Sequence, residues 1–218
     1  MHVYFISGLG ADKRTFQFLD LSWCNPVFTE WPEPQEAETL ARYALRLKET
    51  IPEEKPVIVG LSFGGMLATE IAKACNQSNA IIISGAKTFK EIPPVYRAGK
   101  YFPVYRWLPH KFIKNINKDS EWFFGIKSTA VRKLFKTIIE ETNLNFTEWA
   151  IDAILNWKNE IIPPNITHIH GTADRILPYK YVKADYAIAG GGHLMVMENA
   201  TEISRLLKKI ILNDQGEK

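Results

Sequence analysis

The chain has 218 residues, of which 46% are hydrophobic, 12% aromatic and 23% charged, and its formal net charge is +3. This composition is typical of one soluble globular domain with a large core, and it excludes collagen-like and intrinsically disordered proteins. The 27 Lys and Arg residues barely outnumber the 24 Asp and Glu residues. A nucleic-acid-binding protein is therefore not expected, because such proteins need a dense basic surface.

Targeting patterns and cysteine use indicate the compartment. No segment approaches the roughly 20 apolar residues that cross a bilayer, and the N-terminus lacks the pattern of a signal peptide. The two cysteines, Cys24 and Cys75, match neither a disulfide framework nor a metal cluster. We therefore expect a cytoplasmic protein with reduced cysteines.

Short apolar runs alternate with helical patterns along the chain. Residues 3–7, 57–61, 80–84 and 166–170 have the length of buried strands, and residues 27–31 and 184–189 are weaker candidates. Apolar residues recur at helical spacing in segments 36–50, 64–75 and 201–212. This alternation predicts an α/β fold, in which a mostly parallel sheet of about six strands is flanked by helices.

One long segment interrupts the alternation. Residues 87–162 contain no buried-strand pattern and are rich in aromatic, amphipathic, helix-like sequence. We interpret this segment as a helical insertion in a core made of residues 1–86 and 163–212. The polar tail, residues 213–218, is expected to fray.

The insertion is locally basic. Residues 87–120 contain eight basic residues (Lys or Arg), among them Lys111 and Lys114, but only two acidic residues (Asp or Glu). One interpretation is a solvent-exposed helix face. The other is a surface that binds an anionic substrate, a carrier protein or a membrane.

The sequence 60–64, Gly-Leu-Ser-Phe-Gly, joins a buried strand to a helix. Gly-x-Ser-x-Gly at such a junction is typical of a nucleophile elbow, a tight turn in which side chains at Gly60 and Gly64 would collide with backbone. The free N–H groups at the start of the following helix favour negative charge near Ser62.

A nucleophilic serine needs a general base, and the base needs an orienting acid. Asp174 follows the strand-like run 166–170, and His193 follows the last strand candidate through three glycines. The chain order Ser62, Asp174, His193 is that of the α/β-hydrolases, and it differs from the orders in chymotrypsin and subtilisin.

With these motifs, the sequence resembles the α/β-hydrolase family from about residue 2 to residue 212. The resemblance implies a serine-nucleophile, esterase- or thioesterase-like enzyme with a helical lid at residues 87–162. It makes Ser62 the nucleophile, His193 the general base and Asp174 the acid. It also implies an oxyanion hole formed by the backbone N–H groups of Phe63 and Leu9.

The chain departs from the family pattern at two points. The oxyanion loop usually opens with His-Gly, whereas here it reads Ser7-Gly8-Leu9-Gly10, and the two usual leading strands are absent. A minimal version of the fold, with about six strands, is expected.

Each site residue also has a structural interpretation. Ser62 could be a turn residue, Asp174 a helix N-cap, and His193 a capping or core histidine. His168 and His170 share one face of a strand and could be a metal pair, but no third ligand lies nearby in sequence. We therefore expect neither a metal nor an organic cofactor.

The resulting functional hypothesis is a serine hydrolase that cleaves a small-molecule carboxylic ester or thioester through an acyl-enzyme. Carbon–carbon bond hydrolysis by the same triad is one alternative. A hydrolase-fold ligand-binding or receptor module with little turnover is the other.

Overall fold

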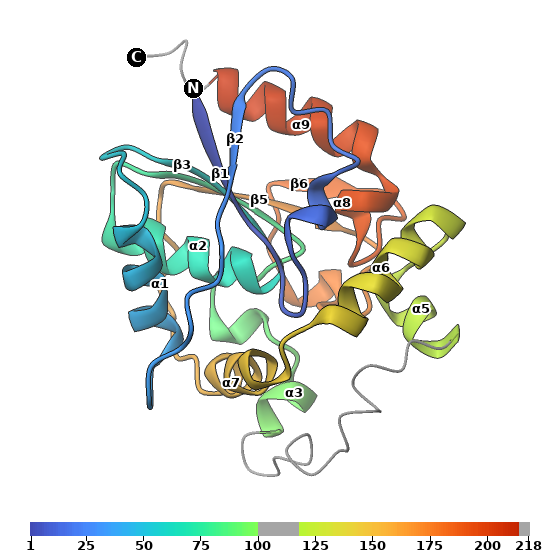
Figure 1. Ribbon diagram of the computed structural model, residues 1–218, viewed down its shortest axis with the longest axis horizontal. Helices are drawn as coiled ribbons and strands as arrows, with labels where there is room; N and C mark the ends of the chain where they lie inside the picture. The colour runs from blue at the N-terminus through green and yellow to red at the C-terminus, as the bar shows by residue number, and fades with distance from the viewer. Residues whose placement is uncertain (100–117, 214–218) are drawn as a thin grey trace.

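The computed structural model describes residues 1–99 and 118–213. In this part of the chain, a six-stranded sheet has the order β2-β1-β3-β4-β5-β6. The strands are β1 (His2–Ile6), β2 (Asn25–Phe28), β3 (Val57–Leu61), β4 (Asn79–Ile83), β5 (Ile166–Gly171) and β6 (Tyr186–Ile188). All neighbouring strands pair in parallel. The predicted α/β fold is confirmed, and Figure 1 shows its helices around the sheet.

The described helices fall into three groups. The helices between the first four strands are α1 (Leu40–Glu49) and α2 (Phe63–Ala74). Those between β4 and β5 are α3 (Pro94–Ala98), α5 (Lys118–Phe124), α6 (Thr129–Glu141) and α7 (Leu144–Leu155). After β6 follow α8 (Met195–Glu198) and α9 (Ala200–Asn213).

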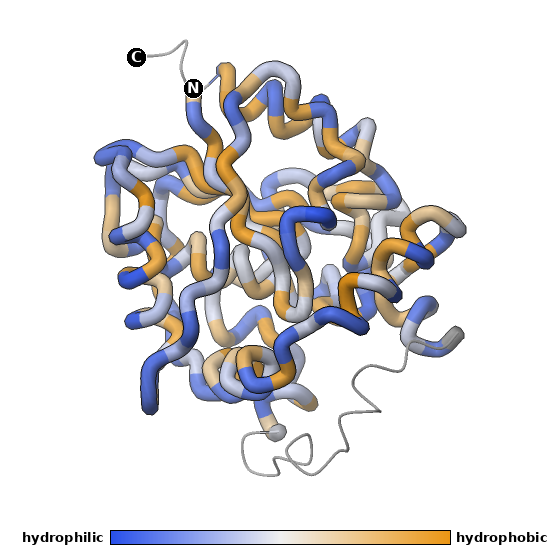
Figure 2. The backbone as a smooth tube through the Cα atoms, in the orientation of Figure 1, coloured by the Kyte–Doolittle hydropathy of each residue, from blue (hydrophilic) through white to orange (hydrophobic). Residues whose placement is uncertain are grey.

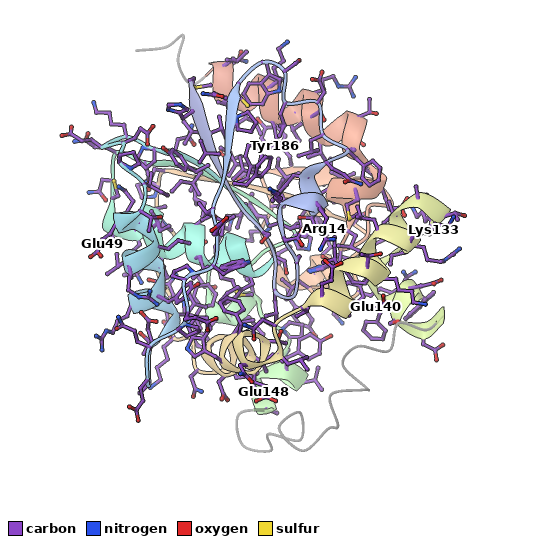
Figure 3. All side chains as sticks on the ribbon, viewed as in Figure 1. Arg14, Glu49, Lys133, Glu140, Glu148 and Tyr186 are labelled. Carbon is purple, nitrogen blue, oxygen red and sulfur yellow. The ribbon has the colours of Figure 1, made fainter. Side chains whose placement is uncertain are left out.

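Alternation of side chains along the strands creates two hydrophobic cores. On one face, Tyr4, Ile58 and Ile82 pack with buried residues of α1, α2 and α7. On the other face, Phe5 and Val59 pack with buried residues of α8 and α9. Hydrophobic segments therefore gather on the strands and on the inner sides of the helices (Figure 2). Charged side chains such as Glu49, Lys133 and Glu140 lie outside (Figure 3).

The helix predicted over residues 36–50 begins four residues later, at Leu40. Ala37 has a positive φ of 53°, which is incompatible with a right-handed helix. The hydroxyl of Thr39 accepts a hydrogen bond from the amide of Arg42 and so caps the helix. The Glu38 carboxylate instead binds the Arg46 guanidinium at 2.7 Å.

The two weaker strand candidates are also shifted or shortened. β2 begins at Asn25 and includes Pro26, which an edge strand tolerates because one side of its ladder is unpaired. At β6, the Asp185 carboxylate accepts a hydrogen bond from the amide of His168. The amide of His168 therefore pairs with a side chain and not with a backbone carbonyl of β6. The regular strand begins at Tyr186, the residue after Asp185.

The segment interpreted as an insertion contains helices in its described parts. Residues 87–99 and 118–162 include α3, α5, α6 and α7, with no strand among them. The division into a core and an insertion stays a prediction. Residues 100–117, which include Lys111 and Lys114, and residues 214–218 lie outside the described residues, whereas Asn213 ends α9.

Among residues 1–99 and 118–213, no helix is both long enough and apolar enough to cross a bilayer.

The turn between β3 and α2 is held by close backbone contacts. A Cβ atom on Gly60 would lie 2.3 Å from the carbonyl oxygen of Gly64. A Cβ atom on Gly64 would lie 2.3 Å from the carbonyl oxygens of both Ile6 and Ser7. Only glycine allows this approach, which brings the ends of β1 and β3 against the start of α2.

Replacing Gly64 with alanine tests this constraint. Because the new methyl group would meet rigid backbone, we expect Gly64→Ala to lower the free energy of unfolding by about 3 kcal/mol or more. The control is Gly65→Ala, whose Cβ would be no closer than 3.3 Å to any neighbour. We expect it to cost less than half as much in urea unfolding. Equal stability of the two variants would contradict the account.

Candidate active site

Ser62 occupies the turn between β3 and α2. Its φ is 53° and its ψ is −112°, a conformation that non-glycine residues rarely adopt. Such a conformation costs of order 1–3 kcal/mol and persists only where the surroundings enforce it. Here the contacts at Gly60 and Gly64 enforce it, and they hold Ser62 at the carboxyl end of the sheet.

His193 faces Ser62 from the loop between β6 and α8. The loop runs through Gly190, Gly191 and Gly192, and the histidine is only 4% exposed. Its Nε2 lies 2.9 Å from the Ser62 Oγ, and its Nδ1 lies 2.8 Å from Oδ2 of Asp174. The sequence-predicted residues Ser62, His193 and Asp174 are therefore joined in one hydrogen-bonded relay.

Asp174 uses its two carboxylate oxygens differently. Oδ1 accepts hydrogen bonds from the amides of Ile176 at 2.8 Å and Leu177 at 2.9 Å. Oδ2 accepts from His193 and also lies 3.3 Å from Nε2 of His170. No helix begins at Asp174, so it is not a helix N-cap; Oδ1 instead holds the turn of residues 174–177, and Oδ2 contacts His193.

The charge state of Asp174 follows from these partners. Burial raises the pKa of its carboxyl group, but the positive charge of His193 and the hydrogen bonds from His170, His193 and Leu177 outweigh burial. The net effect holds the pKa of Asp174 well below its usual range. At neutral pH the carboxylate is ionised and able to stabilise a protonated His193.

The predicted oxyanion donors lie in two segments beside Ser62. A Cβ atom on Gly8 would lie 3.4 Å from the Ser62 Cβ, so the loop after β1 packs against the serine. Phe63 is the first residue of α2, where amides have no intrahelical acceptor. Within the described residues, the amides of Leu9 and Phe63 have no hydrogen-bond acceptor, and they stay available to a ligand.

An apolar pocket of about 460 Å³ lies beside Ser62 and His193. The predicted insertion supplies much of its wall, through Tyr96 of α3, Phe135 of α6 and Ile154 of α7. No Asp, Glu, Lys or Arg occurs among the described residues that line it. Burying a methylene group there is worth about 0.8 kcal/mol, so the pocket favours an apolar, uncharged group.

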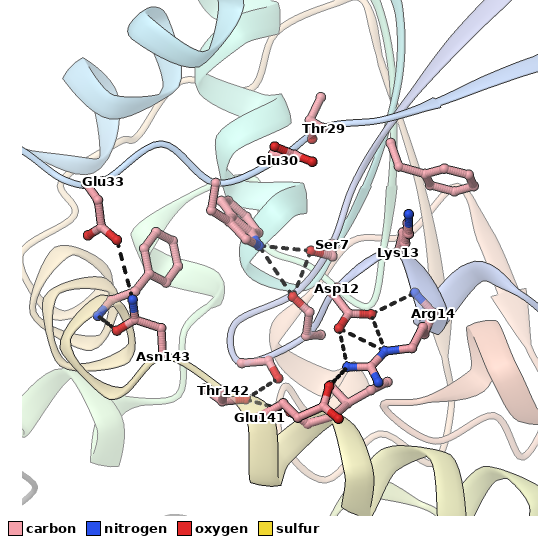
Figure 4. Close-up of a pocket in the computed structure, with 16 residues that line it drawn as sticks. Ser7, Asp12, Lys13, Arg14, Thr29, Glu30, Glu33, Glu141, Thr142 and Asn143 are labelled. Carbon is pink, nitrogen blue, oxygen red and sulfur yellow. Dashed lines mark hydrogen bonds and ion pairs between the residues drawn. The ribbon is translucent and has the colours of Figure 1, made fainter.

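The loop after β1 also borders a second cavity of about 690 Å³, whose lining includes charged side chains (Figure 4). There the Arg14 guanidinium binds the carboxylates of Asp12 at 2.5 Å and Glu141 at 2.6 Å. The Thr142 hydroxyl donates to the carbonyl of Gly10 at 2.8 Å. Neither Ser62 nor His193 lines this cavity, so its contacts tie the loop to the end of α6 and do not form the reaction site.

The structure adds two features that sequence reasoning missed. The first is the contact between His170 and Asp174, for which the four-residue spacing was a signal that the metal-pair interpretation obscured. The second is the identity of the pocket residues, because the aromatic content of the insertion indicated a pocket without indicating which side chains face it. Among the described residues, no group of three His, Cys, Asp or Glu side chains is arranged to hold a metal ion.

Comparisons with known proteins define the class. A model of the alpha/beta hydrolase family matches residues 3–206. The chain therefore belongs to the α/β-hydrolase family. Comparison with curated proteins gave no match.

Solved structures share the fold at low identity. A thermophilic esterase from Thermogutta terrifontis is 15% identical, with a TM-score of 0.71 over 98% of this chain and 90% of that chain. A lipase-esterase related protein from Clostridium acetobutylicum is 16% identical, with a TM-score of 0.69 over 95% and 93%. A meta-cleavage product hydrolase from Pseudomonas fluorescens is 17% identical, with a TM-score of 0.67 over 98% and 91%. At these identities the likeness establishes the fold alone.

The low pKa of Asp174 predicts a pH-dependent contribution to stability. A carboxyl group whose pKa is lowered in the folded state stabilises the fold above its unfolded pKa, near 3.8, and loses that contribution as pH falls below it. Between pH 5 and pH 3, we expect the wild type to lose about 1 kcal/mol more unfolding free energy than Asp174→Asn does. Urea unfolding at the two pH values measures both losses, and equal losses would show that the carboxylate is not stabilised in the folded state.

Proposed function

We propose that the protein is a serine hydrolase that cleaves a carboxylic ester or thioester with an apolar acyl group. The observation that carries this proposal is the relay of Ser62, His193 and Asp174 at the side of the apolar pocket. In this assignment Ser62 is the nucleophile, His193 the general base and Asp174 the acid that orients the base.

In the first half-reaction, the Ser62 Oγ attacks the carbonyl carbon while Nε2 of His193 takes the hydroxyl proton. Asp174 holds the Nδ1–H of His193, which leaves Nε2 free to accept, and it stabilises the imidazolium that forms. The amides of Leu9 and Phe63 stabilise the tetrahedral oxyanion. His193 then gives its proton to the departing alcohol or thiol, and the acyl group stays on Ser62.

In the second half-reaction, water replaces the alcohol. His193 removes a proton from the water molecule, which attacks the acyl carbon, and the proton returns to Ser62 as the carboxylic acid departs. Every proton transfer uses groups of this chain or the substrate.

Two other functions are considered. Carbon–carbon bond hydrolysis is the second candidate, because it can use the same three residues, and a meta-cleavage product hydrolase is among the proteins that share the fold. A ligand-binding module with little turnover is less well supported, because it would have no need for the complete relay that Ser62, His193 and Asp174 form. The proposed interaction of the basic segment with an anionic carrier involves Lys111 and Lys114, which lie outside the described residues, and it stays a prediction.

Removal of the nucleophile tests the catalytic role. Ser62→Ala takes away the attacking oxygen, so we expect turnover of a p-nitrophenyl ester to fall at least about a thousandfold. A fluorophosphonate probe should label the wild type at one site per chain and leave this variant unlabelled. Turnover above about a tenth of the wild-type rate would show that another group is the nucleophile.

The apolar lining predicts acyl-chain selectivity. Because each buried methylene adds about 0.8 kcal/mol, kcat/KM should rise with acyl length from acetyl to about hexanoyl esters of one alcohol. Ile154→Asp puts a charge into the pocket. It should lower the ratio of kcat/KM for the hexanoyl ester to kcat/KM for the acetyl ester at least tenfold.

The matched control is Ile161→Asp, at a residue that is 60% exposed and does not line the pocket. It should retain the wild-type preference. A similar response of both variants, or a preference for acetyl esters in the wild type, would mean that the acyl group binds elsewhere.

A further inference from the structure

Two histidines of β5 form a buried pair behind the site. His168 and His170 point to the same face of the strand, and neither has exposed surface. Nε2 of His168 lies 3.0 Å from Nδ1 of His170, with the rings almost perpendicular at 88°. Nε2 of His170 lies 2.8 Å from the Leu177 carbonyl oxygen and 3.3 Å from Oδ2 of Asp174.

The acceptors around the pair determine where its protons lie. The carbonyl oxygen of Leu177 can only accept a hydrogen bond, so Nε2 of His170 carries a hydrogen. In the neutral ring, Nδ1 of His170 then carries a lone pair and accepts from Nε2 of His168. Nδ1 of His168 then carries no hydrogen, and its lone pair has no hydrogen-bond partner among the described residues.

This arrangement opposes protonation of His170. A protonated His170 would donate from Nδ1, which would require Nε2 of His168 to become an acceptor. The hydrogen of His168 would then move to its Nδ1, where the described residues offer no acceptor. A buried N–H without an acceptor is costly, so His168 keeps His170 neutral with its hydrogen on Nε2.

Resting on the proposed function, we infer that His170 is a positioning residue for Asp174, and that His168 locks its tautomer. The Nε2–H of His170 is shared between the Leu177 carbonyl and Oδ2 of Asp174, the oxygen that also faces His193. Together with the amides of Ile176 and Leu177 on Oδ1, it fixes the plane of the carboxylate. Asp174 therefore presents Oδ2 to His193 in one orientation.

The electrostatics of the pair agree with this geometry. Burial, the largest of the effects on this ring, lowers the pKa of His168 well below its usual value, so His168 is neutral. A neutral pair brings no positive charge to Asp174, which keeps its full negative charge for the imidazolium of His193. Among the described residues, the other titratable groups close to the pair or to Asp174 include Lys87, Tyr96, Tyr179, Asp185 and His193.

The same contacts argue against the metal-pair interpretation of the two histidines. Both ring nitrogens of His170 are engaged by the protein, Nδ1 by His168 and Nε2 by Leu177 and Asp174. In His168, Nε2 is engaged as well. The two rings therefore do not present a pair of free nitrogens to a common ion.

The tautomer can be measured without any substrate. Long-range ¹H–¹⁵N spectra of histidine-labelled wild-type protein at pH 7.5 should show His168 and His170 as neutral rings with the hydrogen on Nε2. The signals are assigned by their loss in His168→Gln and His170→Gln. Protonation of His170, or a hydrogen on its Nδ1 instead of Nε2, would overturn the inference whatever the enzyme's substrate is.

Kinetics test the effect on Asp174. His170→Phe removes the N–H but keeps a ring, and we expect kcat for a p-nitrophenyl ester to fall at least about tenfold, with KM changed less than threefold. Without this donor the carboxylate is more basic and stabilises protonated His193 further, so the acid limb of kcat/KM should move up by about half a pH unit. A packing defect alone would not move this limb.

Two matched variants complete the test. His170→Gln offers an acceptor to His168 and a donor to Leu177 and Asp174, so it should recover most of kcat and the wild-type pH profile. Ile169→Val removes a buried methylene from the opposite face of β5 and should change kcat less than twofold. Wild-type kcat and pH profile in His170→Phe, or identical defects in the Phe and Gln variants, would overturn the positioning role. Loss of the proposed function would show itself separately, as turnover that survives in Ser62→Ala.

Discussion

The backbone conformation of Ser62 is the constraint on which the site depends. A positive φ at a serine is unfavourable, and the chain maintains it by packing Gly60 against Gly64 and Gly64 against the end of β1. These contacts fix three things at once: the direction of the Ser62 side chain, the start of α2, and the position of the loop that holds Leu9. The strain is therefore compensated by backbone packing across β1, β3 and α2.

The groups around this turn lie in two different environments, one apolar and one rich in hydrogen-bond donors. The apolar pocket contacts Ser62 and His193 on one side, whereas Asp174 is enclosed by hydrogen-bond donors on the other. Low polarity strengthens the attraction between Asp174 and a protonated His193, and it also favours an uncharged acyl group. The charged residues Asp12 and Glu141 lie at the outer side of the loop after β1, where both pair with Arg14.

The sequence was most informative where one physical requirement dominates. The runs that became β1, β3, β4 and β5 were predictable because strands buried on both faces are mostly apolar. The hydrogen-bonded grouping of Ser62, Asp174 and His193 was predictable because each of these residues follows a strand, in the chain order of the α/β-hydrolases. Helix α1 was predicted too early, because its apolar spacing continues into residues 36–39 while the φ of Ala37 and the cap at Thr39 depend on local contacts.

Other features depend on contacts between distant segments and left weak traces in the sequence. The pairing of His170 with Asp174 depends on the turn of residues 171–177, which brings the Leu177 carbonyl back to the strand. A histidine in a buried strand resembles an ordinary core residue or a metal ligand until this turn is known. The pocket lining likewise depends on how α3, α6 and α7 pack over Ser62, which the aromatic content of residues 87–162 does not specify.

The most direct test of the central claim is to trap the covalent intermediate. The protein would be mixed with a slowly hydrolysed ester of an apolar acid, quenched in acid during turnover, and digested for peptide mass spectrometry. The account predicts one acyl group per chain, attached to Ser62, which forms at least as fast as the steady-state rate and disappears when substrate is exhausted. Turnover with no acyl group on Ser62, or with the acyl group on another residue, would contradict it.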